Sequence, residues 1–142
     1  LSQFPLFTQP VYSEPALGAN TAVAGLAPEA APSIQVPMIT LDSYIETHRI
    51  EKITLMKIDV VGYEFPILRG MRRFLETSSR LPAIICEIIP TTYDVVTESL
   101  EQFEAYMTGF GYRITTLTEP DIPFSLKDMQ AADKLLFQPD RH

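Results

Sequence analysis

The chain has 142 residues, of which 46% are hydrophobic, and a formal net charge of −7 at pH 7. This length and composition predict one domain with a real hydrophobic core. The acidity excludes nucleic acid and anionic membrane surfaces as partners, because the chain has too few cations to neutralise phosphates. No apolar stretch approaches the ~20 residues of a transmembrane helix, and the single cysteine excludes an internal disulfide.

Residues 1–37 are rich in proline and alanine and hold half of the 12 prolines. They show no sustained period of two or 3.6 residues, and such a segment cannot fold alone. We therefore expect an extended arm that precedes a domain of residues 38–142. A linker without a fixed surface is the alternative. Large apolar side chains are the expected anchors of the arm: Phe4, Leu6, Phe7, Val11 and Tyr12.

The regular part of the chain begins with a short helix that is expected to follow Thr40 and to end near Arg49. Asp42 is its candidate N-cap, and Ser43 with Glu46 is an alternative capping box.

An apolar, β-branched run at residues 54–60 predicts a strand buried on both faces. Gly62 then provides a turn, and a helix is expected over residues 65–77. Apolar side chains recur at the three-and-four spacing of a helix face: Ile67, Leu68, Met71, Phe74 and Leu75.

The remaining elements continue this alternation. A second buried strand is expected at 83–88, and a helix over 97–108 would bury Leu100, Phe103 and Met107 and end at Gly109. Strands are expected at 112–117 and 134–137, with a helical turn near 125–130 between them. Alternating strands and helices predict the α/β class.

Three segments in order resemble the most typical segments of the FkbM-type S-adenosylmethionine-dependent methyltransferases. They are Thr40-Leu41-Asp42-Ser43-Tyr44-Ile45, Lys57-Ile58-Asp59-Val60-x-Gly62-Tyr63-Glu64 with Leu68-Arg69-Gly70, and Ile84-Ile85-Cys86-Glu87-Ile88. The family has an acidic residue where this chain has Val61, so one carboxylate of its pattern is missing here.

The resemblance implies the second half of a Rossmann-like methyltransferase sheet. In the family's numbering its strands would have the order 4-5-7-6, with the last strand antiparallel and helices on both faces. The first half would carry a glycine-rich cofactor loop and a ribose-binding acidic residue, and neither can be placed. Gly18-Ala19-Asn20 looks like such a loop, but no apolar strand precedes it, so we take the match as accidental.

Asp59 and Glu87 are the candidate catalytic residues. Asp59 follows a buried strand and precedes a glycine turn, and the resemblance implies that it faces the cofactor and substrate cleft. It could instead cap the helix that follows. Glu87 interrupts an apolar strand and needs a partner there. It could be a base or substrate contact, or it could pair with Lys57 or Arg80.

Glu64 and Arg69 are candidate substrate-binding residues. Glu64 lies in the first turn of a helix, where a negative charge is favourable in any case. Arg69 belongs to a basic cluster with Arg72 and Arg73, which could hold an anionic substrate or form a solvated helix face. No spacing indicates a metal site, and Cys86 is expected to be a core residue.

Two functions are compatible with this pattern. The first is the substrate side of an S-adenosylmethionine-dependent O-methyltransferase, in which a carboxylate such as Asp59 orients or deprotonates a hydroxyl. The second is a non-catalytic interaction subunit derived from that fold. The chain alone is not expected to bind S-adenosylmethionine, since no cofactor loop is assigned. Residues 54–60 would form an apolar strand edge, so a protein partner or a second copy is expected to cover it.

Overall fold

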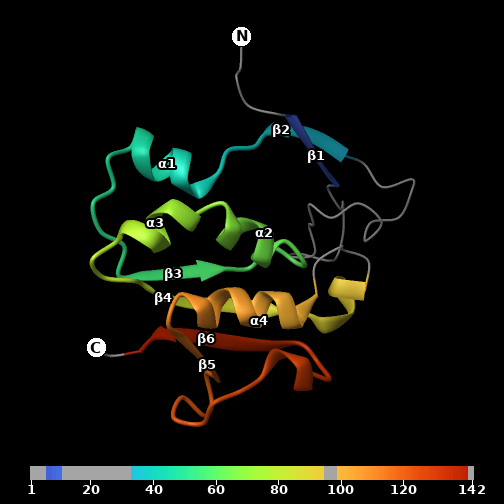
Figure 1. Ribbon diagram of the computed structural model, residues 1–142. Coiled ribbons are helices and arrows are strands. Elements are labelled where there is room, and N and C mark those ends of the chain that lie inside the picture. Colours follow the sequence, from blue (N-terminus) through green and yellow to red (C-terminus); the bar gives the residue numbers. More distant parts are fainter. Residues whose placement is uncertain (1–5, 11–32, 95–98, 141–142) are drawn as a thin grey trace.

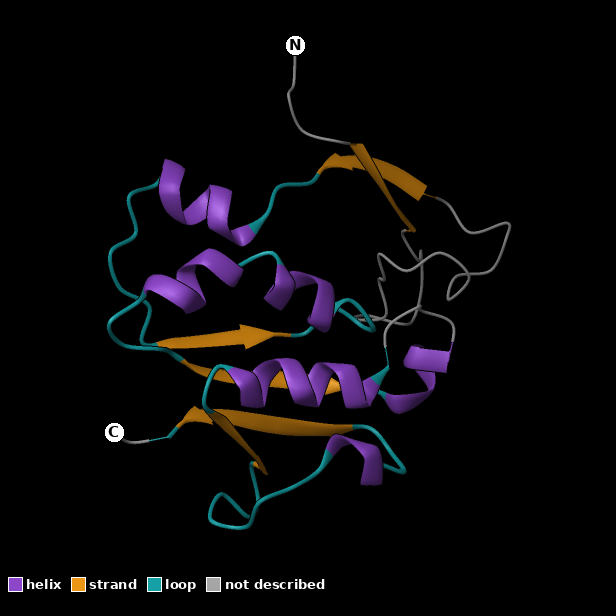
Figure 2. Ribbon diagram, in the orientation of Figure 1, coloured by secondary structure: helices purple, strands orange, loops and turns teal. Residues whose placement is uncertain are grey.

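The computed structural model describes residues 6–10, 33–94 and 99–140. Figure 1 labels its elements along the chain, and Figure 2 distinguishes helices from strands. The strands are β1 (Leu6–Pro10), β2 (Ser33–Pro37), β3 (Leu55–Ile58), β4 (Ala83–Ile88), β5 (Tyr112–Thr116) and β6 (Asp133–Pro139). The helices are α1 (Leu41–Thr47), α2 (Glu64–Arg69), α3 (Arg72–Thr77) and α4 (Leu100–Gly109), and the 3₁₀ turns are η1 (Pro90–Asp94) and η2 (Leu126–Asp128).

The main sheet has four strands in the order β3-β4-β6-β5. β3 and β4 are parallel, and β6 lies between β4 and β5 and is antiparallel to both. The family resemblance implied this order and the antiparallel last strand. The α/β class and the partial Rossmann-like sheet are therefore confirmed.

The described helices gather on one face of this sheet. The parallel step from β3 to β4 passes through α2 and α3, and the step from β4 to β5 passes through α4. Both steps run in the same direction across the sheet, so right-handed connections place both sets of helices on one side. α1 packs on α3, and η2 packs on α4. The helices expected on the second face do not come from the described residues.

Aromatic rings form the centre of the core between these helices and the sheet. The ring of Phe103 on α4 stacks on Phe65 of α2 at 5.0 Å between centroids and on Phe137 of β6 at 5.5 Å. Tyr93 of η1 lies 6.3 Å from the same ring. Stacked aromatic pairs contribute ~0.5–1.5 kcal/mol beyond their buried area, so Phe103 joins α4 to α2, β6 and η1.

The helix expected over residues 65–77 is divided into α2 and α3 at Gly70 and Met71, so that prediction was wrong. The carboxylate of Asp42 accepts hydrogen bonds from the backbone amides of Arg73 and Phe74, both at 2.9 Å. These amides belong to the first turn of α3, which a continuous helix would not leave open. A contact across 31 residues thus overrides the local helical pattern.

The same carboxylate was predicted to cap its own helix, and this prediction was also wrong. Thr40 is the N-cap of α1, and its hydroxyl accepts the amide of Ser43 at 3.1 Å. The alternative Ser43–Glu46 capping box does not form, because Glu46 instead pairs with Arg73 at 2.8 Å. Asp42 therefore ties α1 to α3.

α4 begins at Leu100, with a capping box formed by Ser99 and Gln102. Phe103 and Met107 are fully buried, as the helical spacing predicted. The helix includes Gly109, so the predicted end there was wrong, and Gly111, two residues later, has a left-handed backbone with φ of 78°.

The segment predicted as an extended arm contributes a second sheet. β1 and β2 pair in antiparallel fashion, with Thr8 opposite Gln35. This ladder joins residues far apart in a stretch without hydrophobic alternation, so the sequence pattern did not reveal it. Of the predicted anchors, Leu6 and Phe7 lie in β1, whereas Phe4, Val11 and Tyr12 lie outside the described residues.

Candidate functional site

Four charged side chains gather where β3 and β4 end and β6 begins. We call them the charged cluster: Lys57, Asp59, Glu87 and Lys134. Alternation along the strands places them on the face of the sheet opposite the buried Ile58, Cys86 and Ile88. They therefore lie on the face that the described helices leave uncovered.

Asp59 is the centre of the charged cluster. Its Oδ2 accepts a hydrogen bond from Nζ of Lys57 at 2.5 Å, and its side chain is 35% exposed. The Lys57 ammonium lowers the pKa of Asp59, and partial burial opposes this effect. Hydrogen bonding with the Glu87 side chain and the charge of Lys134 also lower the pKa. Asp59 is therefore ionised at neutral pH.

Glu87 stands beside Asp59 on the neighbouring strand. Ile58 pairs with Cys86 in the parallel register, so the next position along places Asp59 beside Glu87. On its other side, Glu87 lies directly opposite Lys134 of β6. The charge of Glu87 also contributes to the raised pKa of Lys57, after the larger effect of Asp59. Two carboxylates and two ammonium groups thus balance one another, which reduces the repulsion between the acids.

The loop of residues 59–63 has an unusual backbone. Val61 has φ of 47° and Gly62 has φ of 87°, both in the left-handed region. Glycine adopts this region readily, whereas a β-branched residue is strained there. Such strain persists only where the surroundings hold the backbone in place.

Glu64 holds this loop from the inside. Its carboxylate accepts the amide of Gly62 through Oε1 at 3.2 Å and Oε2 at 3.1 Å, and Oε2 accepts the hydroxyl of Tyr93 at 3.0 Å. Glu64 has no exposed surface. Burial raises the pKa of Glu64, against hydrogen bonds from Tyr93 and nearby amides. Burial and the charge of Glu64 raise the pKa of Tyr93.

The structure brings together Asp59 and Glu87 but not the other two predicted site residues. Glu64 is fully buried and already hydrogen-bonded, so its position favours an anchoring role over substrate contact. Arg69 is exposed at the other end of α2, with its guanidinium 5.9 Å from the centroid of the Phe65 ring. Arg72 pairs with Glu76 at 2.7 Å and Arg73 with Glu46, as on a solvated helix face.

Sequence reasoning missed two residues of this region. Lys134 meets Glu87 only because β6 inserts between β4 and β5, and no short-range signal indicates that pairing. Tyr93 lies in a 3₁₀ turn that the sequence did not predict. Lys57 was considered a partner of Glu87, but its direct hydrogen bond goes to Asp59.

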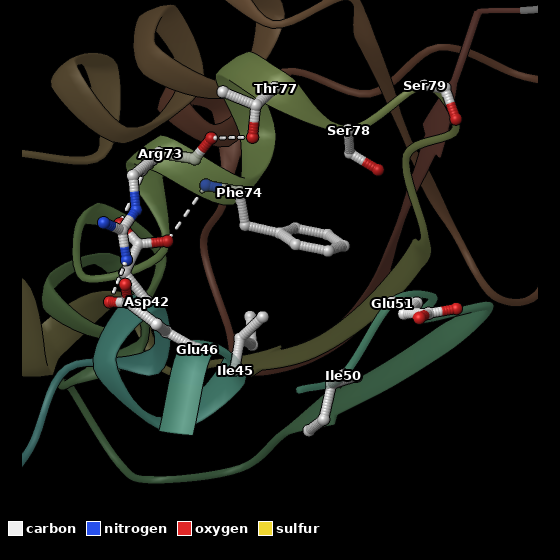
Figure 3. A pocket seen from close by; sticks show the side chains of 10 residues that line it. All are labelled: Asp42, Ile45, Glu46, Ile50, Glu51, Arg73, Phe74, Thr77, Ser78 and Ser79. Atoms are coloured by element: carbon white, nitrogen blue, oxygen red, sulfur yellow. Dashed lines mark hydrogen bonds and ion pairs between the residues drawn. The ribbon is translucent and has the colours of Figure 1, made fainter. Parts of the chain in front are cut away.

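A groove of about 450 Å³ lies between α1 and α3, as Figure 3 shows. The ring of Phe74 projects into it, between Arg73 on one side and Glu51 on the other. Glu51 precedes β3, and Ser79 precedes β4. The groove is therefore at the opposite end of the parallel strands from Asp59.

Among the described residues, no group of three or more histidine, cysteine, aspartate or glutamate side chains could hold a metal ion. No helix in residues 6–10, 33–94 and 99–140 is both long enough and apolar enough to cross a membrane. Cys86 is fully buried in β4, as expected, and burial raises its pKa.

A comparison with protein families identifies the domain that contains these elements. The family model described as Methyltransferase FkbM domain matches residues 8–114, which is more than half of the chain. The match begins in β1 and ends in β5. Comparisons with curated proteins and with solved structures find no match. The chain belongs to the FkbM methyltransferase domain family.

Proposed function

We propose that this chain forms the acceptor side of an FkbM-type O-methyltransferase. The observation that carries the proposal is the meeting of Asp59 and Glu87 on adjacent strands, where the parallel pair β3 and β4 ends. In open α/β sheets, ligands bind beyond the carboxyl ends of the strands. Two carboxylates at that edge suit a substrate that presents hydroxyl groups.

In this proposal Asp59 accepts the hydrogen bond of the acceptor hydroxyl. Its low pKa makes it a weak base, so it orients the oxygen more than it removes the proton. Glu87, next to it, contacts the same or a neighbouring hydroxyl. Lys57 holds Asp59 through their ion pair, and Lys134 lies opposite Glu87 across the ladder of β4 and β6. Methyl transfer depends mainly on proximity and alignment, which these contacts supply.

The family implies S-adenosylmethionine as the methyl donor, and the described residues do not fit it by themselves. A nucleoside cofactor needs a slot for the base and an acidic partner for the ribose. The described groups at the Asp59 edge are the salt-linked carboxylate of Asp59, the neighbouring Glu87 and a loop anchored by Glu64. The groove of Figure 3 lies at the other end of the strands. We therefore expect no measurable binding of S-adenosylmethionine to the 142-residue chain alone.

Calorimetric titration of S-adenosylmethionine into concentrated protein tests this expectation, and no heat of binding is the expected result. Saturable one-to-one binding with micromolar affinity would contradict it. Transfer of a labelled methyl group to a panel of polyhydroxylated acceptors tests the role of the carboxylates in any form of the protein that does bind the cofactor. There, Asp59→Asn should lower the rate by at least tenfold, whereas Arg69→Gln should not.

The second candidate is an interaction subunit, and the edge of the sheet favours it. β3 is a terminal strand of the four-stranded sheet and pairs within that sheet with β4. Leu55 is 58% exposed, and Lys57 is the single charge in β3. Soluble proteins normally pair, cover or charge such an edge. A second copy of the chain or another protein would therefore add a strand beside β3.

Sedimentation at micromolar concentration and amide exchange over Leu55–Ile58 test this second candidate. We expect an assembly larger than the monomer and slow exchange of the outward amides of β3. A monomer in which these amides exchange within seconds would contradict it.

A further inference from the structure

Glu64 and Tyr93 are buried polar groups that the proposed chemistry does not use. Glu64 has no exposed surface and Tyr93 is only 7% exposed. Within the described residues, no buried side-chain nitrogen or oxygen lacks a hydrogen-bond partner. A polar pair in such surroundings is strong when satisfied and costly when broken.

The pair joins two different loops of the site. Through Gly62, Glu64 holds the loop that follows Asp59 and β3. Through Tyr93, it holds η1, which follows Glu87 and β4. The two loops therefore meet at one carboxylate, at the same end of the strands as the charged cluster.

We propose that Glu64 and Tyr93 are positioning residues that fix the distance between Asp59 and Glu87. The inference deepens the proposed function, since its importance for catalysis rests on those two carboxylates. The hydrogen bond between Tyr93 and Glu64 keeps the loop after β3 and the loop after β4 in one arrangement. Without it, the strained backbone at Val61 and Gly62 loses a support and Asp59 moves relative to its partners.

Tyr93→Phe is the test, because it removes one hydroxyl and keeps the ring that packs near Phe103. Tyr112→Phe is the matched control. Its hydroxyl is also buried and donates to the carbonyl of Pro82 at 2.9 Å. Pro82 immediately precedes β4, so this hydrogen bond is at the opposite end of that strand. Both variants lose one buried hydrogen bond, and only Tyr93→Phe loses it at the site.

Carbon-13 NMR titration of the Asp59 carboxyl in the 142-residue chain provides the readout. In Tyr93→Phe we expect the pKa of Asp59 to rise toward the ordinary value of about 3.9, because its contacts with Lys57 and Glu87 loosen. The amide of Gly62 should also exchange faster. Tyr112→Phe should leave both quantities at their wild-type values.

An unchanged Asp59 titration in Tyr93→Phe, with a loss of stability equal to that of Tyr112→Phe, would overturn the proposal. If Tyr93→Phe does not fold, Glu64→Gln replaces it, since the glutamine amide keeps the shape and one acceptor oxygen. The Asp59 titration and the loss of stability of that variant, compared with Tyr112→Phe, then decide. The measurement needs neither cofactor nor acceptor, so failure of the proposed methyl transfer would not affect it.

Discussion

Asp42 gives the sharpest test of the packing described above, because one carboxylate caps a helix that begins 30 residues later. Asp42→Ala removes two hydrogen bonds, to the amides of Arg73 and Phe74. Loss of an N-cap costs ~0.5–2 kcal/mol, and loss of a negative charge at a helix N-terminus costs a further ~0.3–1 kcal/mol. We therefore expect a total loss of about 1–3 kcal/mol in the free energy of unfolding.

Urea denaturation followed by circular dichroism measures this loss. With a denaturant slope of ~2 kcal/mol per molar, a loss of ~2 kcal/mol lowers the midpoint by about 1 M. Glu46→Gln is the matched control, since it breaks only the exposed ion pair with Arg73 and should cost less than ~1 kcal/mol. Equal losses in the two variants would refute the capping role of Asp42.

Three further predictions concern the site and its supports. Val61→Asn should raise the urea midpoint by relieving ~1 kcal/mol of strain, since asparagine tolerates the left-handed backbone of this position; a lower midpoint would show that valine packing dominates. Lys57→Gln should weaken the acid dependence of stability. The pKa of Asp59 in the folded chain is below its ordinary value, so the stabilisation from its ionised form is present above pH ~3.9 and is lost as the pH falls further. Unfolding free energies measured from pH 2 to 6 should therefore change less in the variant than in the wild type. A pH profile identical to that of the wild type would count against the Lys57 contact. Ser99→Ala should cost ~1 kcal/mol through loss of the α4 capping box, which thermal unfolding would detect, and wild-type stability would contradict it.

The strands of the main sheet were predictable because burial imposes apolar residues on them. Residues 83–88 read as a strand in the sequence and form β4 with the same bounds. The order of the strands came from the family resemblance, and the structure confirms it. The apolar spacing also located α4, because its buried residues lie within one segment.

The incorrect predictions share a long-range cause. A single glycine such as Gly70 does not by itself end a helix in a sequence. The expected helix is divided into α2 and α3, and the carboxylate of Asp42, far away in the chain, accepts two amide hydrogen bonds at the start of α3. A Cβ at Gly70 would also lie 3.2 Å from the carbonyl oxygen of Ile67 and 3.6 Å from Cβ of Thr40. Sequence reasoning from one segment cannot include such neighbours.

The same limit applies to the candidate site. Asp59 and Glu87 could each be named from their own strand, but their contact depends on the register of β3 and β4. Lys134 enters through the antiparallel β6. Glu64 was predicted to bind substrate or to be a favourable acid in the first turn of a helix. Its burial follows from the packing of α2 against η1, which brings Tyr93 to its carboxylate.

The loop of residues 59–63 combines two features that packing alone does not require. It holds a β-branched residue in the left-handed region, and it is anchored from beneath by a carboxylate buried at the cost of its solvation. A simple strand-to-helix connection could replace Val61 with glycine or asparagine and avoid the first cost. Strained backbone that is held firmly often occurs where a side chain must be presented to a ligand. In the proposed function that side chain is Asp59, which is partly exposed and ionised beside this loop. This arrangement favours a ligand-facing role for Asp59 over the capping role that was its alternative.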